Sequence, residues 1–256
     1  MDPITIVGIL LGVFSVLFAA VEEGTSLSAL LAPTALLIVF GGTTGATISC
    51  FTIRNILDVL GNVKLIVFRT AYDFNALIEM FVEMAGVTRK DGILALENYK
   101  LKVDHPFLKR GIRLIVDGTN AELVKQLMIT QMTVDEEALK TSAAVFATAG
   151  GFAPTLGIIG TVVGLVNVLG NLSDPESLGP AIAMAFIATL YGVSSANLMF
   201  LPISKKFGII AKEEVAMREM ITEGVLSIYA GDGPHVVSQK LLAFLTEKER
   251  AHAKTA

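Results

Sequence analysis

Charge is scarce in this sequence, and four long segments contain none. Charged residues make up 17% of the 256 residues and hydrophobic residues 53%, whereas soluble domains carry about 25% charged residues. No Asp, Glu, Lys or Arg occurs in residues 3–21, 24–53, 141–173 or 177–204. A helix needs roughly 20 residues to cross the hydrocarbon core of a bilayer, so each segment predicts a membrane span.

The sequence also lacks the motifs of common catalytic and metal sites. It has no phosphate-binding GxxxxGK[ST] loop, no CxxC or HExxH spacing and no GxSxG nucleophile elbow. The three histidines are scattered through loop and tail sequence, and the lone Cys50 has no internal disulfide partner. We therefore expect neither an enzyme, a bound metal nor a cofactor, and no nucleic-acid partner.

Basic residues are missing from the two short connections between the spans. All 20 Lys and Arg fall between Arg54 and Lys140 or between Lys205 and Lys254, while residues 22–30 and 174–176 carry only acids. The positive-inside rule then places both termini and the large central loop in the cytoplasm. The start Met1-Asp2-Pro3 has no basic region typical of a signal peptide, so the first segment is expected to stay as a helix in the cytoplasmic membrane.

The spans contain no ionisable side chain that could carry a proton or a cation. Such residues are costly within a bilayer and are kept there for function. Threonine hydroxyls and backbone carbonyls can coordinate a metal cation but cannot accept and release protons near neutral pH. If this protein energises a process with an ion, the carboxylate must come from a partner.

These patterns predict an all-α membrane protein with four transmembrane helices, a helical cytoplasmic domain between spans 2 and 3, and a helical cytoplasmic tail. Apolar residues recur at helical spacing in the central loop, Asn120 is expected to cap a helix, and Asp117-Gly118 to end the one before it. The expected parts are a hairpin at 1–53 with spans near 3–21 and 31–53, a cytoplasmic domain at 54–145, a hairpin at 146–204 with spans near 148–172 and 178–202, and a tail at 205–256.

The third uncharged segment is longer than one membrane crossing. Its 33 residues would extend about 50 Å as a helix. We expect the helix to begin in the cytoplasm and to be loosened by Pro154 near the inner interface.

Small residues recur at steps of three and four in the same segment. Gly157, Gly160 and Gly164 form a ridge that would let another helix approach closely. The partner helix could belong to the same chain or to another copy. Their concentration in one span favours assembly between copies.

Four stretches resemble the flagellar stator subunit family MotA/PomA. They are RKDGILALE at 89–97, APTLGIIGTVVGLVNVL at 153–169, GPAIAMAFIATLYGVSSAN at 179–197 and EGVLSIYAGDGPHVVSQKLLAFL at 223–245. The resemblance implies a ring of five such subunits in the bacterial inner membrane around a peptidoglycan-anchored MotB/PomB-type partner, whose single span carries the ion-binding aspartate. It further implies that ion flow generates torque on the rotor protein FliG.

The resemblance also assigns roles to individual residues. Arg89 and Glu97 match the charged pair that engages the rotor, and Lys90 matches a basic neighbour in sodium-type members. Pro154 and Pro202 match two prolines that couple ion occupancy to motion.

Thr161 and Thr189 match threonines that line the ion path in sodium-driven members. Na⁺ is therefore favoured over H⁺ as the transported ion, since hydroxyl oxygens are hard ligands for a partly dehydrated cation. A threonine in a membrane helix also commonly bonds to its own backbone. Tyr191 is expected to be a packing residue.

Two alternatives remain open. An ExbB/TolQ-type energiser shares the arrangement of a ring around a partner, but typically has three spans and an external N-terminus. A membrane scaffold that recruits proteins without ion flow would also fit the composition.

Overall fold

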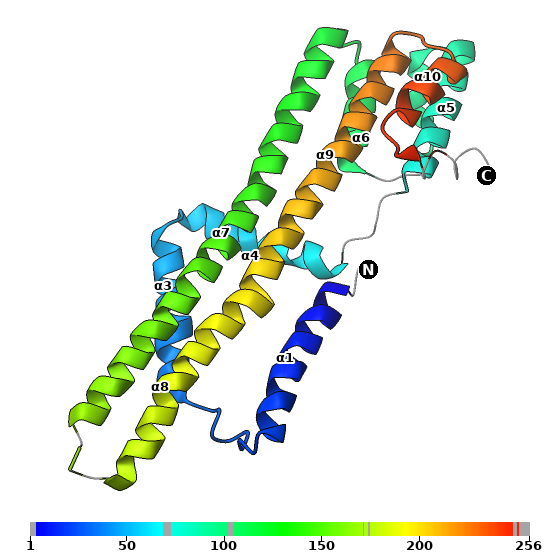
Figure 1. Ribbon diagram of the computed structural model, residues 1–256. Helices are drawn as coiled ribbons and strands as arrows, with labels where there is room; N and C mark the ends of the chain where they lie inside the picture. The colour runs from blue at the N-terminus through cyan, green and yellow to red at the C-terminus, as the bar shows by residue number, and fades with distance from the viewer. Residues whose placement is uncertain are drawn as a thin grey trace. The chain divides into compact units, whose positions relative to one another are not determined.

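The computed structural model describes residues 4–68, 73–101, 105–170, 172–173, 175–247 and 250, and these contain helices and no strand. Figure 1 shows how the helices follow one another along the chain. In order they are α1 (Ile4–Glu22), α2 (Pro33–Leu36), η1 (Leu37–Gly41), α3 (Gly42–Ser49), α4 (Ile53–Phe68), α5 (Phe74–Asp91), η2 (Ile93–Asn98), α6 (Pro106–Val116), α7 (Ala121–Gly170), α8 (Pro175–Ser195), η3 (Ala196–Phe200), α9 (Leu201–Tyr229) and α10 (Pro234–Leu242).

Three helical stretches are long and apolar enough to cross a membrane. They are α1, α7 and the continuous run from α8 through η3 into α9. A fourth candidate is Pro33–Ser49 followed by Ile53–Ile66, two pieces that meet at a bend of 120°. The four uncharged segments of the sequence each coincide with one of these candidates.

The helix of the second candidate span ends at Ser49, before the expected residue 53. The Ser49 hydroxyl donates to the carbonyl of Gly45 at 2.8 Å, and α3 ends at Ser49. Thr52 then begins a new helix, because the Asn55 N–H donates to its hydroxyl at 3.3 Å. The uncharged run therefore conceals a helix end, which hydropathy alone cannot locate.

Two short π-helices, η1 and η3, interrupt two of the candidate spans. The Leu201 N–H bonds to the Ala196 carbonyl, five residues back, and Pro202 follows directly. A wider turn just before a proline gives its ring room that a regular α-helix lacks. Pro202 thus lies at the junction of η3 and α9.

α7 runs unbroken through Pro154. Its start confirms the predicted cap, because the Leu123 N–H donates to Asn120 Oδ1 at 2.8 Å. The preceding helix ends at Val116, and Gly118 adopts a φ of 75°. The expected loosening is not seen as a break: α7 continues for 50 residues with Pro154 inside it. The proline still leaves the Gly150 carbonyl without its usual N–H donor.

The chain divides into two compact units, which we describe separately. Unit 1 comprises residues 1–70 and 138–209, and unit 2 comprises residues 71–137 and 210–256. α4, which the sequence placed in the cytoplasmic domain, belongs to unit 1. One reason is that Asn62 on α4 donates to the Ser142 hydroxyl on α7 at 3.0 Å.

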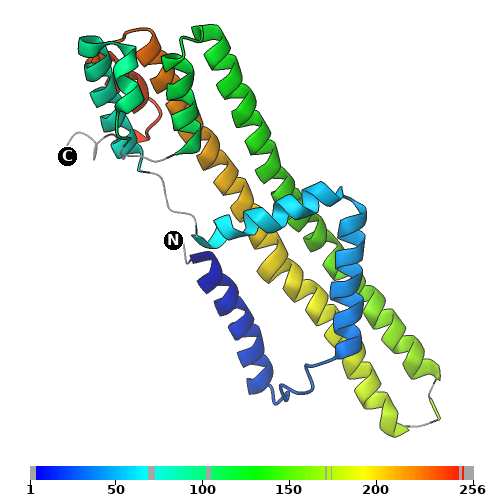
Figure 2. The ribbon, with the colours of Figure 1, turned by 180° about the vertical axis from the view of Figure 1, so that it is seen from behind.

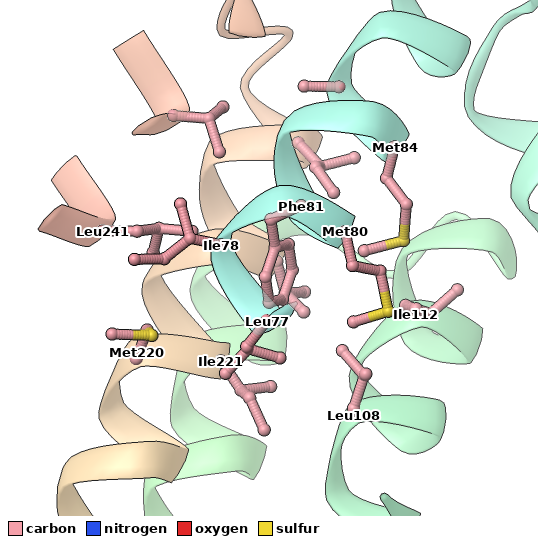
Figure 3. Close-up of a cluster of buried hydrophobic side chains, with 14 of the residues drawn as sticks. Leu77, Ile78, Met80, Phe81, Met84, Leu108, Ile112, Met220, Ile221 and Leu241 are labelled. Carbon is pink, nitrogen blue, oxygen red and sulfur yellow. The ribbon is translucent and has the colours of Figure 1, made fainter. Parts of the chain in front are cut away.

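Unit 2 has a dense core of large side chains. Phe81, Met80 and Met84 of α5 are fully buried, as are Leu108 of α6 and Ile221 of α9. Figure 3 shows these side chains converging from α5, α6 and α9, together with Leu241 from α10. Such a core is what a helical domain needs to be stable in water.

The buried cluster of unit 1 contains no such large side chains among the described residues. It consists chiefly of small or β-branched residues, namely Ala32, Ala35, Val39, Ile187 and Ala188. No residue of α1 is buried, and large apolar side chains along α1, α7 and α8 are exposed. Figures 1 and 2 show the C-terminal part of α7 running alongside α8. This surface is typical of helices that face lipid or other membrane helices.

Candidate functional site

The glycines of α7 lie against α8 of the same chain. A methyl group added at Gly157 would come within 2.9 Å of the Ala188 carbonyl oxygen, and one at Gly164 within 2.6 Å of Ala185 Cβ. At Gly160 it would lie 2.6 Å from Ala188 Cβ. From the other helix, a methyl group at Gly192 would lie 2.4 Å from the Ala153 carbonyl oxygen. The small-residue ridge is therefore occupied within the chain, by α8.

This close approach brings together the two threonines that the sequence singled out. Thr161 of α7 and Thr189 of α8 are 28 residues apart in sequence, and their hydroxyl groups are in hydrogen-bond contact. Thr161 Oγ1 also lies 3.1 Å from the carbonyl oxygens of Gly157 and Ala185. Both side chains are half-buried. The result is a small cluster of oxygens between two otherwise apolar helices.

Tyr191 belongs to the packing of this unit. Its ring packs against Phe40, its hydroxyl group donates to the Leu30 carbonyl, and the Ala32 N–H donates to its oxygen at 3.3 Å. These bonds connect α8 to the residues just before α2. The prediction that Tyr191 is a packing residue is confirmed.

Thr43 and Thr47 of α3 are polar groups that the sequence did not single out. Their side chains are buried, and their hydroxyl oxygens have no hydrogen-bond partner among the described residues. A threonine in a helix usually bonds to the carbonyl four residues earlier. The sequence signal was the spacing of four residues, which places both hydroxyl groups on one face of the helix.

The charged residues assigned to rotor contact lie in unit 2. Arg89 and Lys90 close α5, Gly92 turns the chain with a φ of 81°, and Glu97 follows in η2. Arg89, Lys90 and Glu97 are all exposed. They form one short charged segment on the surface of the unit.

The turn between α9 and α10 packs against this segment. A methyl group added at Gly233 would lie 2.9 Å from Arg89 Nη1. Two of the four resembling stretches, residues 89–97 and 223–245, therefore meet in space, although more than 120 residues separate them.

An ion cluster holds that turn. Lys240 donates to Asp232 at 2.9 Å and to the Ser227 hydroxyl at 3.1 Å, and it pairs with Glu223 at 3.2 Å. The hydrogen bond from Lys240 is the main reason why the pKa of Asp232 lies below its usual 3.8. The same bond raises the pKa of Lys240 above 10.5, against a smaller opposing effect of burial.

A groove of about 790 Å³ begins beside Glu97. Its lining includes Tyr99, Lys109, Arg110 and Arg113. Burial, followed by the neighbouring Glu83 carboxylate, raises the pKa of Tyr99 to about 12. The phenol is therefore neutral at physiological pH, and the basic residues dominate the charge of the groove.

A half-buried guanidinium joins three helices of unit 2. Arg218 of α9 bonds to Asp135 of α7 and pairs with Glu214 at 2.9 Å, and its charge lies 5.2 Å from the centre of the Phe107 ring. His105, which caps α6, lies 3.6 Å from Glu214. The sequence offered no signal for this network, since Asp135 and Arg218 are 83 residues apart.

Comparison with known proteins identifies relatives along nearly the entire chain. Residues 100–220 match the model of the MotA/TolQ/ExbB proton channel family. Motility protein A of Bacillus subtilis (strain 168) is 38% identical over 98% of this chain and 93% of the relative. Chemotaxis protein PomA of Vibrio alginolyticus is 36% identical over 98% of both chains.

Solved structures agree with the sequence relatives. The B. subtilis flagellar MotAB stator complex contains a chain that superposes with a TM-score of 0.89 at 37% identity, covering 96% of this chain and 98% of that one. C. jejuni MotAB also gives a TM-score of 0.89, at 28% identity, covering 96% and 97%. Since relatives above 30% identity extend along almost its full length, this protein belongs to the MotA/TolQ/ExbB proton channel family.

Proposed function

We propose that this chain is a flagellar motor stator subunit, which with a MotB/PomB-type partner converts ion-motive force into torque on the rotor protein FliG. The similarity to motility proteins and to MotAB stator complexes over the whole chain is the observation that carries the proposal. The stator relatives also favour this function over an ExbB/TolQ-type energiser. The family is described as one of proton channels, in keeping with a chain that is not an enzyme.

The distribution of charge and exposure supports assembly with other chains. The uncharged spans need a carboxylate from elsewhere to bind an ion, which a MotB/PomB-type helix would provide. The exposed apolar side chains of α1, α7 and α8 would be covered by lipid, by the partner and by further copies in a ring of five. The four candidate spans cross the inner membrane with both termini in the cytoplasm.

Na⁺ is the transported ion that the threonine pair favours. The cluster of Thr161, Thr189 and the carbonyls of Gly157 and Ala185 presents hard oxygen atoms, which suit a partly dehydrated cation. The hydroxyl hydrogens are already bonded within the helix pair. An arriving cation would therefore use the free lone pairs of these oxygens.

The exposed segment with Arg89, Lys90 and Glu97 is our proposed contact with FliG. Exposed charges give fast, renewable association without tight burial, which suits a contact that must be made and released repeatedly. The turn at Gly233 packs against this segment, and the ion cluster around Lys240 holds that turn in place.

Swimming speed tests the function and the ion together. The chain and its partner are expressed in a cell that lacks stator units, and speed is measured as external Na⁺ varies at a constant proton-motive force. We expect motility that rises with Na⁺. Absence of swimming despite stable membrane insertion would contradict the stator function, and speed independent of Na⁺ would assign the chain to H⁺.

Isosteric substitutions test the role of the threonines. Thr161→Val and Thr189→Val remove the hydroxyl groups and should raise the Na⁺ concentration needed for half-maximal speed. Thr155→Val is the matched control, because Thr155 is exposed on the same helix and its hydroxyl group donates to the Phe152 carbonyl at 2.7 Å. An equal effect of all three substitutions would contradict an ion pathway at the pair.

Pro154 and Pro202 are proposed to couple ion occupancy to motion. Each lies where a span lacks one regular backbone hydrogen bond, which makes bending there less costly. Pro154→Leu should assemble with the partner and reach the membrane in normal amount, yet generate no torque. Normal swimming of this variant would refute the coupling role.

A further inference from the structure

Gly233 makes room for the side chain of Arg89. A methyl group added at Gly233 would lie 2.9 Å from Arg89 Nη1 and 3.9 Å from Arg89 Cζ. Apart from its chain neighbours, no other described residue has an atom within 4 Å of that methyl group. The guanidinium group of Arg89 therefore occupies the space that a side chain at position 233 would fill. Both residues belong to unit 2.

The backbone at Gly233 does not require glycine. Its φ of −72° and ψ of 157° are extended, a conformation that any residue adopts, whereas Gly231 has a φ of 76°. Position 233 is also the N-cap of α10, where serine, aspartate and asparagine are favoured. The turn accounts for the glycine at position 231, and the space taken by Arg89 accounts for the one at position 233.

The charge of Arg89 is available to another protein. Its side chain is exposed, and no ion pair of Arg89 is found among the described residues. The acid next to Gly233 in the chain, Asp232, accepts a hydrogen bond from Lys240 at 2.9 Å. Lys240 thus holds the Asp232 carboxylate, and the Arg89 guanidinium keeps the planar fork of donors that binds a carboxylate through two parallel hydrogen bonds.

We propose that Gly233 is a positioning residue, which orients the Arg89 guanidinium toward a carboxylate of the rotor. The inference rests on the proposed function, in which Arg89 contacts the rotor. A side chain at position 233 displaces the guanidinium at little cost, because only the far end of a flexible side chain has to move. The contact then keeps its charge but loses the orientation that two parallel hydrogen bonds require.

Gly233→Ser tests the positioning in the full complex. The substitution adds a side chain against Arg89 and supplies a favourable N-cap for α10, so the complex should assemble in normal amount. The chain and its partner are placed together in lipid nanodiscs, and their dissociation constant for purified FliG is measured. We expect Gly233→Ser to raise this constant by up to about fivefold, the range of one exposed ion pair, and Arg89→Ala to raise it at least as much.

Combining the substitutions separates positioning from general damage. Gly233→Ser should have no further effect in the Arg89→Ala background and its full effect in the Lys90→Ala background. Gly86→Ala is the matched control and should leave binding unchanged, because it adds a methyl group to α5 one turn before Arg89, where nothing lies within 4 Å. An equal effect of Gly233→Ser with and without Arg89 would overturn the proposal. So would normal FliG binding by Gly233→Ser when Arg89→Ala weakens it.

A second pair of substitutions locates the guanidinium group without the rotor. Gly233→Asp and Gly233→Asn are nearly equal in size and both cap helices, but only the first adds a carboxylate beside Arg89. We expect Gly233→Asp to melt at the higher temperature, and the difference between the two to fall when Arg89→Ala is added. A difference that Arg89→Ala leaves unchanged would overturn the proposal. If the difference does fall but Arg89→Ala leaves FliG binding intact, the rotor contact is wrong and the packing of Arg89 on Gly233 stands.

Discussion

The two units of this chain are stabilised in opposite ways. Unit 2 buries large side chains such as Phe81, Met84 and Phe107 and leaves charges on its exterior. Unit 1 has alanines and glycines at its closest contacts and exposes large apolar side chains along α1, α7 and α8, although Phe207 of this unit is fully buried. In water, burying large apolar groups drives folding, whereas lipid is as apolar as leucine and offers no such gain. Unit 2 therefore depends on side-chain volume, and unit 1 on close backbone approach.

Removing volume from unit 2 should have the largest effect. Phe81→Ala leaves a cavity among Met80, Ile221 and their neighbours, and truncation of a buried phenylalanine costs about 3–5 kcal/mol. Phe81 is fully buried, with an exposed fraction of 0%. We expect unit 2 to unfold at clearly lower temperature, measured by proteolysis of the purified complex during heating.

Phe186→Ala in unit 1 is the control for that substitution. The Phe186 side chain is 63% exposed on α8, so its removal leaves no internal cavity and should shift the unfolding temperature little. If both substitutions destabilise the protein equally, the contrast between the two units is not one of core volume.

Adding volume to unit 1 should have the next largest effect. Gly192→Ala places a methyl group against the Ala153 carbonyl and within 3.1 Å of Gly157 Cα, and neither backbone can yield without separating α7 from α8. Overpacking of this kind costs about 1–3 kcal/mol. We expect a lower melting temperature in lipid nanodiscs and loss of swimming, because the Thr161–Thr189 contact depends on the same approach.

The matched change is Gly45→Ala, which adds the same methyl group to a span where nothing lies within 4 Å. This variant should retain both stability and motility. A Gly192→Ala protein with wild-type stability would mean that α7 and α8 are held by contacts other than the glycine face.

The sequence located the long apolar helices better than it located the ends of the helices. Uncharged runs located the apolar segments, since hydropathy reports composition over a window. The bend between α3 and α4 escaped because Ser49, Cys50 and Thr52 end and begin helices through hydroxyl and thiol hydrogen bonds, without any charge. π-Helices such as η1 and η3 have no distinct composition and could not be predicted.

The sequence singled out the members of one contact between distant residues but not those of another. The resemblance to a known family singled out Thr161 and Thr189, and the structure places them in contact. The Arg218–Asp135 pair lies outside the four resembling stretches, and its members are indistinguishable in sequence from solvated charges. Only the packing of α7 against α9 within unit 2 identifies them as partners.

The smallest expected effect concerns the ion cluster at the turn of unit 2. Lys240→Gln removes the partner of Asp232 and Glu223, and an exposed pair of this kind contributes about 0–1 kcal/mol. Because the folded pKa of Asp232 is lowered from 3.8, its contribution to stability is fully present above that pH and disappears as the pH falls through the folded pKa. Because the folded pKa of Lys240 is raised from 10.5, the contribution of Lys240 to stability is fully present below pH 10.5. It disappears as the pH rises through the folded pKa of Lys240.

The difference in unfolding free energy between wild type and Lys240→Gln should therefore be constant between pH 3.8 and 10.5 and shrink outside that range. Urea unfolding followed by proteolysis across this range measures the difference. Lys212→Gln is the control, since no ion pair of Lys212 is found among the described residues. A difference that grows or shrinks around neutral pH would show that groups other than Lys240 and its two carboxylates hold the turn beside Arg89.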